Sequence, residues 1–315
     1  MVLLGKLYRS LDEEALRVLL AVERSSRGRE YAPVELVGKI SGIPPRRLDA
    51  LLEALVAKKM LARRVGQFVG YRLSFLGLDM LALDDLVKRE ALAAVGERIG
   101  VGKESDVYEA LDSSGSRVIL KLYRIGRTSF RRTARVRAYA LERELADWLE
   151  ESKLAAEREF AALSKLSPRT RFVPKPIARS RHALVTEFVE GLELYRVKAL
   201  EKPREVLEGV LEVVRVAFLD VGIVHGDLSE YNVLVAYPDE RPLVIDWPQY
   251  IYREHPGARD ALERDVRYLS RFFEKRFGVE FDWKSFLSEL LGAARGSSGR
   301  VEDDLGRSDQ EPLYP

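Results

Sequence analysis

The sequence predicts an α+β protein in which a small winged-helix domain precedes a larger domain made of two lobes. Residues 11–73 contain three helix-like segments followed by two strand-like runs. Residues 94–189 contain several strand-like runs and one helix, and residues 190–292 are mainly helical around a single polar loop. The chain has 315 residues, of which 46% are hydrophobic, so it can bury cores for more than one domain.

The first domain, expected over residues 1–80, reads as a winged helix. Its expected elements are a helix over residues 11–22 begun by Ser10, helices over 34–41 and 46–59 joined by a turn at 42–45, and strands over 60–64 and 68–73 joined across Gly66. Three helices followed by a small hairpin are typical of a winged helix. A connecting helix from Leu76 to Glu90 leads out of this domain, and residues 81–93 are the expected linker.

Basic side chains give this domain a candidate nucleic-acid surface. Residues 1–80 contain fourteen Lys or Arg and nine Asp or Glu side chains. Arg46 and Arg47 begin the second helix of the turn motif, and Arg63 and Arg64 lie beside the wing. A basic helix in this place suits the phosphates and groove edges of a duplex. A second interpretation stays open, because winged helices also serve as packing or protein-docking modules.

A glycine-rich stretch opens the second domain. Glycines let backbone amides close over phosphates without a clash from a Cβ atom, and a serine nearby can add a hydroxyl donor. The candidate nucleotide-binding residues in this stretch are Gly100, Val101, Gly102, Lys103, Ser105 and Val107. A Gly-x-Gly pattern alone also marks plain β-hairpins, so the stretch gains its meaning from the strand that follows.

That next strand carries a lysine, and a later helix carries its candidate partner. Lys121 points opposite to its apolar neighbours on the strand over residues 117–123, where a lysine can reach the α and β phosphates of a nucleotide. A helix expected from Leu154 to Leu166 offers Glu157 and Glu159, and we expect one of these to pair with Lys121. Further along, an extended connector over 172–177 and a buried strand over 182–189 lead to the position where a kinase hinge presents backbone groups to adenine.

The polar loop is the strongest signal in the chain. Residues 223–235, with the sequence I-V-H-G-D-L-S-E-Y-N-V-L-V, place Asp227 and Asn232 five residues apart between two apolar runs. In phosphoryl-transfer loops such an Asp orients the attacking group and the Asn binds the metal that shields the phosphates. Asp246 ends the next apolar run, where a short hairpin would bring it back beside Asn232 as a second metal ligand. The alternative is that these are ordinary turn residues.

Together these motifs predict a bilobal, protein-kinase-like second domain. The expected parts are an N-lobe over residues 94–189, a C-lobe over 190–292 that begins with a helix from Arg204 to Val221 ahead of the loop, and a mobile acidic tail over 293–315. Only about a dozen residues separate Asp246 from the helix that begins near Ala258. This distance leaves no room for the long activation segment of ordinary protein kinases, so the usual platform for peptide substrates is missing.

An arginine-rich segment follows the Lys121 strand. It contains no acid between residues 125 and 137, and its arginines are Arg127, Arg131, Arg132, Arg135 and Arg137. Such a run is either a solvated loop or a loop that contacts phosphates, and the composition leaves both possibilities open.

Several of these motifs together resemble the RIO family of atypical kinases. The motifs that carry the resemblance are G-V-G-K-E-S-D-V-Y at 100–108, G-R-T-S-F-R at 126–131, V-P-K-P-I at 173–177, H-G-D-L-S-E-Y-N at 225–232 and I-D-W-P-Q at 245–249. The leading winged helix makes the chain similar to the RIO2 branch. One departure is Trp247, which stands where many members have phenylalanine and changes packing more than chemistry.

The resemblance implies an ATP-binding domain with a defined set of site residues. It implies that Lys121 holds phosphates with Glu159 as its partner, that Ser105 touches the phosphates, that Glu187 to Val189 form the hinge, that Asp227 is catalytic, and that Asn232 and Asp246 bind the metal. Proteins of this kind are thought to act in maturation of the small ribosomal subunit and to pass through a phosphorylated aspartate, which here corresponds to Asp246. A carboxylate can serve as the nucleophile when a metal neutralises the neighbouring phosphate. The implied partners are the precursor of the small subunit and its ribosomal RNA.

Asp265 is expected on the helix after the loop, where it either braces the loop or faces solvent. The chain has no cysteine and three scattered histidines, which excludes disulfides and thiolate metal sites, so we expect Mg²⁺ or Mn²⁺ held by oxygens. The net charge is only +2, and any nucleic-acid partner must be met by local basic patches. No apolar run approaches a membrane span and no signal pattern is present, so we expect a cytoplasmic protein with no membrane partner. We also expect a monomer.

Two other functions stay open. A small-molecule phosphotransferase of the aminoglycoside or choline kinase type shares the H-G-D motif and a nearby asparagine, although the winged helix and Pro248-Gln249 argue against it. A nucleic-acid-binding regulator that uses its kinase-like domain only as a nucleotide sensor is the alternative without catalysis.

Overall fold

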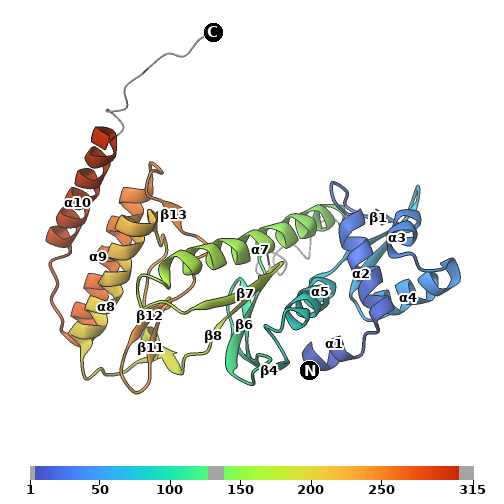
Figure 1. Cartoon of the computed structure of the whole chain (residues 1–315), viewed down its shortest axis with the longest axis horizontal. Coiled ribbons are helices and arrows are strands. Elements are labelled where there is room, and N and C mark those ends of the chain that lie inside the picture. The colour runs from blue at the N-terminus through green and yellow to red at the C-terminus, as the bar shows by residue number, and fades with distance from the viewer. Residues whose placement is uncertain (1–3, 127–137, 305–315) are drawn as a thin grey trace, which may run out of the picture. The chain divides into compact units, whose positions relative to one another are not determined.

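The computed structural model describes residues 4–126 and 138–304, and within residues 138–146 and 295–304 it describes the backbone alone. The chain divides into two compact units (Figure 1). Unit 1 comprises residues 1–161 with 175–188, and unit 2 comprises residues 162–174 with 189–315. Each unit is described by itself. No helix in the part of the chain that the structure covers is long and apolar enough to cross a membrane.

Unit 1 begins with the winged helix that the sequence predicts. Its elements are α1 (Leu4–Arg9), α2 (Glu13–Ser25), β1 (Ala32–Pro33), α3 (Val34–Ser41), α4 (Pro45–Ala57), β2 (Leu61–Val65), β3 (Val69–Leu73) and α5 (Phe75–Lys88). The three strands form an antiparallel sheet in the order β1-β3-β2, with the wing between β2 and β3. The turn between α3 and α4 ends α3 at Gly42, which adopts a left-handed φ of 65°.

The first long helix begins at a different residue from the one expected. Asp12 caps α2, because its side chain accepts a hydrogen bond from the backbone N–H of Ala15 at 2.7 Å. Ser10, the expected start, donates its hydroxyl to the carbonyl of Leu7 instead. An aspartate before two glutamates is the stronger cap here, since the carboxylate both accepts a backbone hydrogen bond and suits the positive end of the helix.

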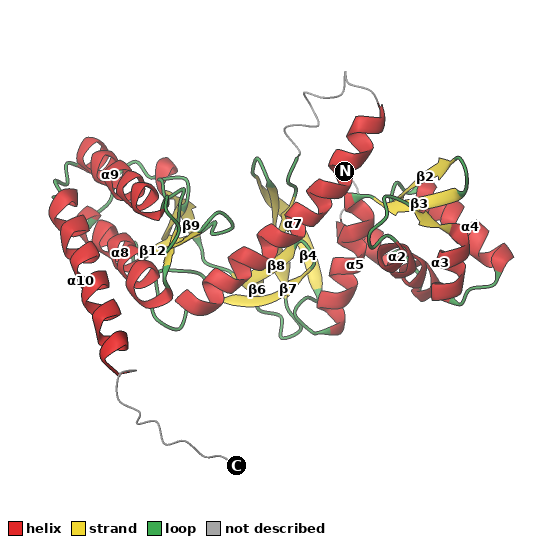
Figure 2. Cartoon of the chain, turned by 90° about the horizontal axis from the view of Figure 1, so that it is seen from above, coloured by secondary structure: helices red, strands yellow, loops and turns green. Residues whose placement is uncertain are grey.

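A five-stranded antiparallel sheet forms the rest of unit 1. Its strands are β4 (Ala94–Val101), β5 (Ser105–Leu111), β6 (Arg117–Tyr123), β7 (Pro176–Ser180) and β8 (Ala183–Glu187), and their order is β4-β5-β6-β8-β7. Helix α5 lies between α2 and this sheet (Figures 1 and 2). Its residues are apolar on most sides, as expected for a helix buried between two layers.

The winged helix and the five-stranded sheet share one hydrophobic core. Buried side chains of α2, α4 and α5, such as Leu19, Leu52 and Leu83, belong to the same continuous cluster as Leu120 of β6 and Val185 of β8. The connecting segment is therefore part of a packed body and not a loose linker.

Helix α7 is longer than expected. It runs from Ala138 to Leu166, sixteen residues before the predicted start at Leu154. Residues 138–153 contain no glycine or proline and are rich in Ala, Leu and Glu, which are strong helix formers, so the helix continues through a stretch whose charges hid its apolar period.

Unit 2 holds the polar loop. Its elements are β9 (Gly191–Glu193), the 3₁₀ turn η1 (Leu194–Arg196), α8 (Pro203–Val216), the π-helical turn η2 (Ala217–Val221), β10 (Ile223–Val224), β11 (Val233–Ala236), β12 (Pro242–Val244), β13 (Ile251–Tyr252), α9 (Ala258–Phe277) and α10 (Trp283–Asp304). The strands form a sheet in the order β12-β11-β9 and a separate pair, β10 with β13. Helix α10 reaches into the segment expected as a tail, and residues 305–315 lie outside the described part.

The helix predicted over residues 204–221 divides into two pieces. Helix α8 ends at Val216, and the π-helical turn η2 follows it to Val221. Gly222 then ends the turn with a φ of 78°. This residue is suited to the left-handed conformation because it has no Cβ atom. The wider turn sets the start of β10, which leads directly into the polar loop.

Candidate active site

In unit 1 the glycine-rich stretch forms the turn of the β4–β5 hairpin. The backbone N–H of Gly102 donates to the carbonyl of Ser105 at 2.8 Å and closes this turn. Gly100 pairs with Val107 across the two strands. Val101, Gly102 and Lys103 are exposed. A Cβ atom on Gly102 would lie only 3.2 Å from the Ser105 hydroxyl, so a side chain here would require Ser105 to shift by a few tenths of an ångström.

Lys121 lies directly beside this hairpin. In the β5–β6 register it is opposite Val107, one of the glycine-rich hairpin residues. Its Nζ is 2.7 Å from Oε2 of Glu159 on α7, and both side chains are largely buried. The ring of Tyr123 lies 4.9 Å from Nζ. Glu157, the other candidate on α7, is exposed and lies 3.9 Å from Arg179 instead. The structure thus pairs Lys121 with Glu159.

The expected hinge follows β8. Glu187 ends that strand, its backbone N–H donates to the carbonyl of Lys175, and its side chain accepts from the backbone N–H of Lys175, each at 3.0 Å. The ring of Phe188 receives the guanidinium of Arg117 at 3.6 Å. Glu187 and Val189 are half-buried. These contacts fix the strand end from which the chain enters unit 2.

In unit 2 the polar loop holds Asp227 and Asn232 in one turn. The Asn232 side chain donates its Nδ2–H to the carbonyl of Asp227 at 2.7 Å, which explains the five-residue spacing. Asn232 is buried, whereas the Asp227 side chain is exposed. The loop therefore fixes the backbone of Asp227 and leaves its carboxylate facing the surroundings.

Asp246 returns to Asn232 through the hairpin that the sequence predicts. Strands β11 and β12 pair, and the N–H of Ile245 donates to the carbonyl of Asn232 at 2.9 Å. Asp246 itself adopts a φ of 68°, in the left-handed region that residues other than glycine rarely occupy. Strained backbone of this kind is concentrated at functional sites, so the geometry marks Asp246 as a candidate functional residue.

Asp265 of α9 braces the polar loop from behind. It is buried and accepts a hydrogen bond from the N–H of Gly226 at 2.8 Å. Gly226 has a φ of 86°, and a Cβ atom there would lie 3.0 Å from the carbonyl oxygen of Gln249. Burial raises the pKa of Asp265 to about 6, although the Gly226 N–H and Arg264 oppose this shift. Of the two open interpretations of Asp265, the bracing role is the one observed.

Sequence reasoning did not assign a role to His225. Its Nε2 lies 3.1 Å from the carbonyl oxygen of Ile245, and its ring packs 4.6 Å from that of the buried Trp247. His225 thus ties the polar loop to the backbone beside Asp246. Its position directly before Gly226 and Asp227 was the one sequence feature that pointed to a role for His225, and only the fold shows its partners.

Asn232 and Asp246 could hold a divalent cation. The hydrogen bond from Nδ2 of Asn232 leaves Oδ1 as an oxygen ligand, and Asp246 follows Ile245, which is bonded to Asn232. Within the described residues, no group of three or more His, Cys, Asp or Glu side chains could hold a metal. This donor set fits Mg²⁺, which takes one or two protein ligands and completes its shell with phosphates and water.

The expected basic surface of the winged helix is altered by ion pairs. Nε of Arg47 lies 2.7 Å from Glu14, and its Nη2 lies 3.1 Å from Asp12. Arg46 is exposed, as are Asp49 and Glu53 on the same helix, α4. Helix α4 thus presents less positive charge than its sequence suggests.

These features define a protein of the kinase-like phosphotransferase class. They are a winged helix, a glycine-rich hairpin, a Lys–Glu pair, and an Asp–Asn loop with a second Asp. Models of known families agree with this class. The model described as "RIO domain" matches residues 106–286, and the model described as "Rio2, N-terminal" matches residues 8–89. The chain belongs to the RIO family of protein kinases and, within it, to the Rio2 group.

Similar proteins cover most of the chain. A serine/threonine-protein kinase rio2 of Schizosaccharomyces pombe is 36% identical over 89% of this chain and 81% of its own length. A serine/threonine-protein kinase RIO2 of Caenorhabditis elegans is 38% identical over 97% of this chain, which spans 59% of that relative. The crystal structure of the Rio2 kinase-ADP/Mg²⁺-phosphoaspartate complex from Chaetomium thermophilum superposes with a TM-score of 0.79, at 32% identity and 93% coverage of both chains.

Proposed function

We propose that this chain is an ATP-dependent kinase and ATPase that acts in maturation of the small ribosomal subunit and that Asp246 carries the phosphoryl group during turnover. The observation that carries the proposal is the left-handed backbone of Asp246, one residue beyond the hydrogen bond between Ile245 and Asn232. The relative from Chaetomium thermophilum, which is similar over nearly its whole length, was crystallised as a complex with ADP, Mg²⁺ and phosphoaspartate.

In the proposed mechanism, unit 1 binds the phosphates of ATP. Lys121 contacts the α and β phosphates, and its ion pair with Glu159 sets the direction of its side chain. The turn between Gly102 and Ser105, in which Lys103 and Glu104 are exposed, offers backbone groups and the Ser105 hydroxyl to the same phosphates. Glu187 and Val189, with Phe188 between them, present backbone groups to adenine.

Unit 2 supplies the chemical groups. When bound, Mg²⁺ would be held by Asn232 and Asp246 and would neutralise the charge of the phosphates. One carboxylate oxygen of Asp246 attacks the γ-phosphorus, the bond to the bridging oxygen breaks, and ADP leaves. Water then attacks the acyl phosphate, phosphate leaves with its electron pair returning to Asp246, and Asp227 accepts the proton of the water.

The short stretch after Asp246 supports a target other than a free peptide. Residues 247–257 contain only the two-residue strand β13 before α9 begins, so the chain has no activation segment there on which a peptide could lie. For the proposed RNA contact, Arg63 and Arg64 of the wing are exposed, although Arg64 also lies 3.5 Å from Glu30. Arg47 is engaged by two acids. The arginine-rich segment over 127–137, also expected to contact RNA, lies outside the described residues.

The proposal is tested by the lability of the transferred phosphate. The protein is incubated with Mg²⁺ and ATP labelled at the γ-phosphate, and the labelled protein is treated with hydroxylamine, which cleaves acyl phosphates. We expect label that hydroxylamine removes and that Asp246→Asn abolishes. The matched control is Asp239→Asn, an exposed aspartate in the turn between β11 and β12, which should label normally. Label that is stable to hydroxylamine and maps to serine or threonine would contradict the intermediate, and transfer to a small metabolite would favour the alternative phosphotransferase.

A further inference from the structure

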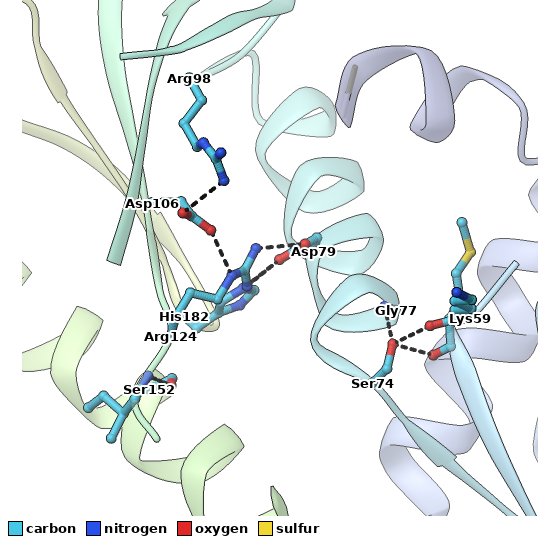
Figure 3. Close-up of polar contacts among 11 residues, drawn as sticks. Lys59, Ser74, Gly77, Asp79, Arg98, Asp106, Arg124, Ser152 and His182 are labelled. Atoms are coloured by element: carbon cyan, nitrogen blue, oxygen red, sulfur yellow. Dashed lines mark hydrogen bonds and ion pairs between the residues drawn. The ribbon is translucent and has the colours of Figure 1, made fainter. Parts of the chain in front are cut away.

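A buried cluster of charges lies in unit 1, between helix α5 and the strands that carry the glycine-rich hairpin (Figure 3). Its members are Asp79 of α5, Asp106 of β5, Arg124 directly after β6, and His182 directly before β8. All four residues are at most 9% exposed. Charges are rarely buried so completely, because removing them from water is costly unless each one is paired.

Arg124 stands at the centre of this cluster. Its two terminal nitrogens donate to the two carboxylate oxygens of Asp79 at 2.7 and 2.8 Å, which is the bidentate geometry that only arginine provides. Its Nε donates to Asp106 at 3.2 Å. One guanidinium therefore joins the helix of the winged-helix part to the second strand of the hairpin.

The neighbours of Asp79 favour its ionised form although it is buried. Burial raises the pKa of Asp79, but the charge of Arg124 and the hydrogen bond from His182 outweigh burial and hold that pKa below its ordinary value. Burial lowers the pKa of His182, whose Nε2 lies 2.8 Å from Asp79. The same Nε2 lies 3.0 Å from Nη1 of Arg124, so His182 contacts both members of the Asp79–Arg124 ion pair.

The backbone around Arg124 extends these links to the proposed phosphate site. The N–H of Arg124 donates to the carbonyl of Glu104, in the turn of the glycine-rich hairpin. The N–H of Ile125 donates to Ser152 at 3.0 Å, and Ser152 lies two helical turns before Glu159 on the same helix, α7. Asp106, which Arg124 holds, directly follows Ser105. Arg124 thus contacts the hairpin twice, and the next residue contacts the helix that pairs with Lys121.

We propose that Arg124 is a positioning residue that fixes the turn of the glycine-rich hairpin, and that its pair with Asp79 makes nucleotide affinity depend on helix α5 of the winged-helix part. The inference deepens the proposed function, because it assumes that the hairpin binds nucleotide phosphates. It follows that an event that displaces α5 changes the affinity of the nucleotide site through this ion pair, within one packed body.

The test compares two variants of the same helix. Asp79→Asn keeps the size of the side chain but removes the charge that faces Arg124. Ser74→Ala is the matched control, because Ser74 caps α5, accepts from the N–H of Gly77 at 3.2 Å and has no contact with the cluster. Both variants should lower the thermal unfolding midpoint, so the control separates loss of stability from loss of positioning.

Two measurements are made on each full-length protein: the affinity for ADP with Mg²⁺ by calorimetry, and amide hydrogen exchange of residues 98–106 without nucleotide. We expect Asp79→Asn to weaken ADP binding by about 3- to 30-fold and to speed exchange in the hairpin, whereas Ser74→Ala changes neither. Asp79→Asn combined with Asp106→Asn should weaken binding by less than the product of the single effects, because both carboxylates contact Arg124, although Asp106 also contacts Arg98.

The outcomes separate this inference from the proposed function. If the unchanged protein binds ADP and Asp79→Asn binds it equally well with unchanged hairpin exchange, the cluster is purely structural and the inference is wrong. If the unchanged protein does not bind ADP, the proposed function fails, and hairpin exchange still decides whether Arg124 positions the turn. Should Asp79→Asn not fold, Arg124→Lys is measured in the same way, since it keeps the charge and loses the planar fork.

Discussion

Asp227 combines an exposed carboxylate with a fixed backbone, because Asn232 holds its carbonyl. A side chain that acts on the attacking group can be removed without disturbing the groups that hold phosphates and metal. In the polar loop, different residues therefore act on the attacking group and hold the metal.

Asp227→Ala should abolish turnover but leave ADP affinity close to that of the unchanged protein. We expect the rate of ATP hydrolysis to fall by about 10²- to 10⁴-fold, the usual cost of losing one positioned acid–base group. Turnover assays and calorimetry on the same samples check this. Asp220→Ala, which removes an exposed acid in η2, is the control. Unchanged turnover in Asp227→Ala would remove this residue from the mechanism.

The pKa of Asp265 gives the protein a specific dependence of stability on pH. A carboxyl whose pKa is raised in the folded state binds its proton more tightly there, so its contribution is fully present below the unfolded pKa and is lost as pH rises through the folded pKa of about 6. Between pH 4 and pH 7, the unchanged protein should lose roughly 2 kcal/mol of unfolding free energy relative to Asp265→Asn. Urea unfolding of both proteins across this range measures the difference, and a difference independent of pH would contradict the assignment.

Local spacing let the sequence predict contacts within the polar loop, while contacts between distant residues were harder to predict. The return of Asp246 to Asn232 follows from two apolar runs joined by a short turn. To predict the pair of Lys121 with Glu159, one must know how the strand that carries the lysine packs against the helix that carries the glutamate. Asp79 and Arg124 are 45 positions apart, and Asp79 occupies a helix whose other residues are mainly apolar, so no period or motif connects them.

Among the elements, α5 shows how closely the backbone of a helix can approach its neighbour. A Cβ atom on Gly77 would lie 2.4 Å from the carbonyl oxygen of Met60, the residue just before β2. The helix can pack against the base of the wing only because this position has no side chain.

Gly77→Ala should therefore destabilise the protein, even though alanine favours helix formation by about 1 kcal/mol over glycine. We expect a loss of about 1–3 kcal/mol, the typical cost of adding an atom where no space exists. Gly292→Ala in α10, where nothing lies within 4 Å of the added atom, should instead gain up to about 1 kcal/mol. Chemical denaturation of both variants tests the contrast, and equal gains would show that the Met60 carbonyl yields at little cost.

Helix ends were predicted less well than helix existence. The start of α2 shifted to Asp12 because side-chain capping decides it, and α7 extends to Ala138 because a charged stretch of good helix formers conceals its period. The π-helical turn after α8 has no sequence signal of its own, since it depends on where Gly222 lets the chain turn. The bounds of α3 agree with the prediction, because Pro33 and Gly42 mark both ends.

For the chain as a whole, the shared core of unit 1 changes how its parts can act. The sequence predicts a winged-helix domain followed by a two-lobed domain, and in the structure α5 of the winged helix packs in the same hydrophobic cluster as the five-stranded sheet. The sequence predicts the elements of both parts but not the contact between them, because the local patterns that predict helices and strands are the same whether or not the two parts pack together. The bounds predicted for the domains remain predictions.

The arginine-rich segment over residues 127–137 is expected to contribute to RNA binding by the whole protein. Changing Arg131, Arg132 and Arg135 to alanine should flatten the dependence of binding on salt concentration by about 0.7 to 0.9 for each phosphate that the protein no longer neutralises. A salt titration of binding to small-subunit RNA measures both slopes. The control replaces three exposed cations of α9, Arg259, Arg271 and Lys275. Equal slopes for the unchanged protein and the triple-alanine variant would leave the winged helix as the proposed RNA-binding surface.

The short segment from Asp246 to α9 has a consequence for how the activity depends on time and on enzyme concentration. Protein kinases that switch themselves on do so when one copy modifies the activation segment of another, so their progress curves begin with a lag that shortens as more enzyme is added. Here residues 247–257 include β13, which is paired with β10, and the helix begins at Ala258. No segment is available there to receive such a modification. Progress curves should therefore begin without a lag that arises from modification of this stretch by a second copy.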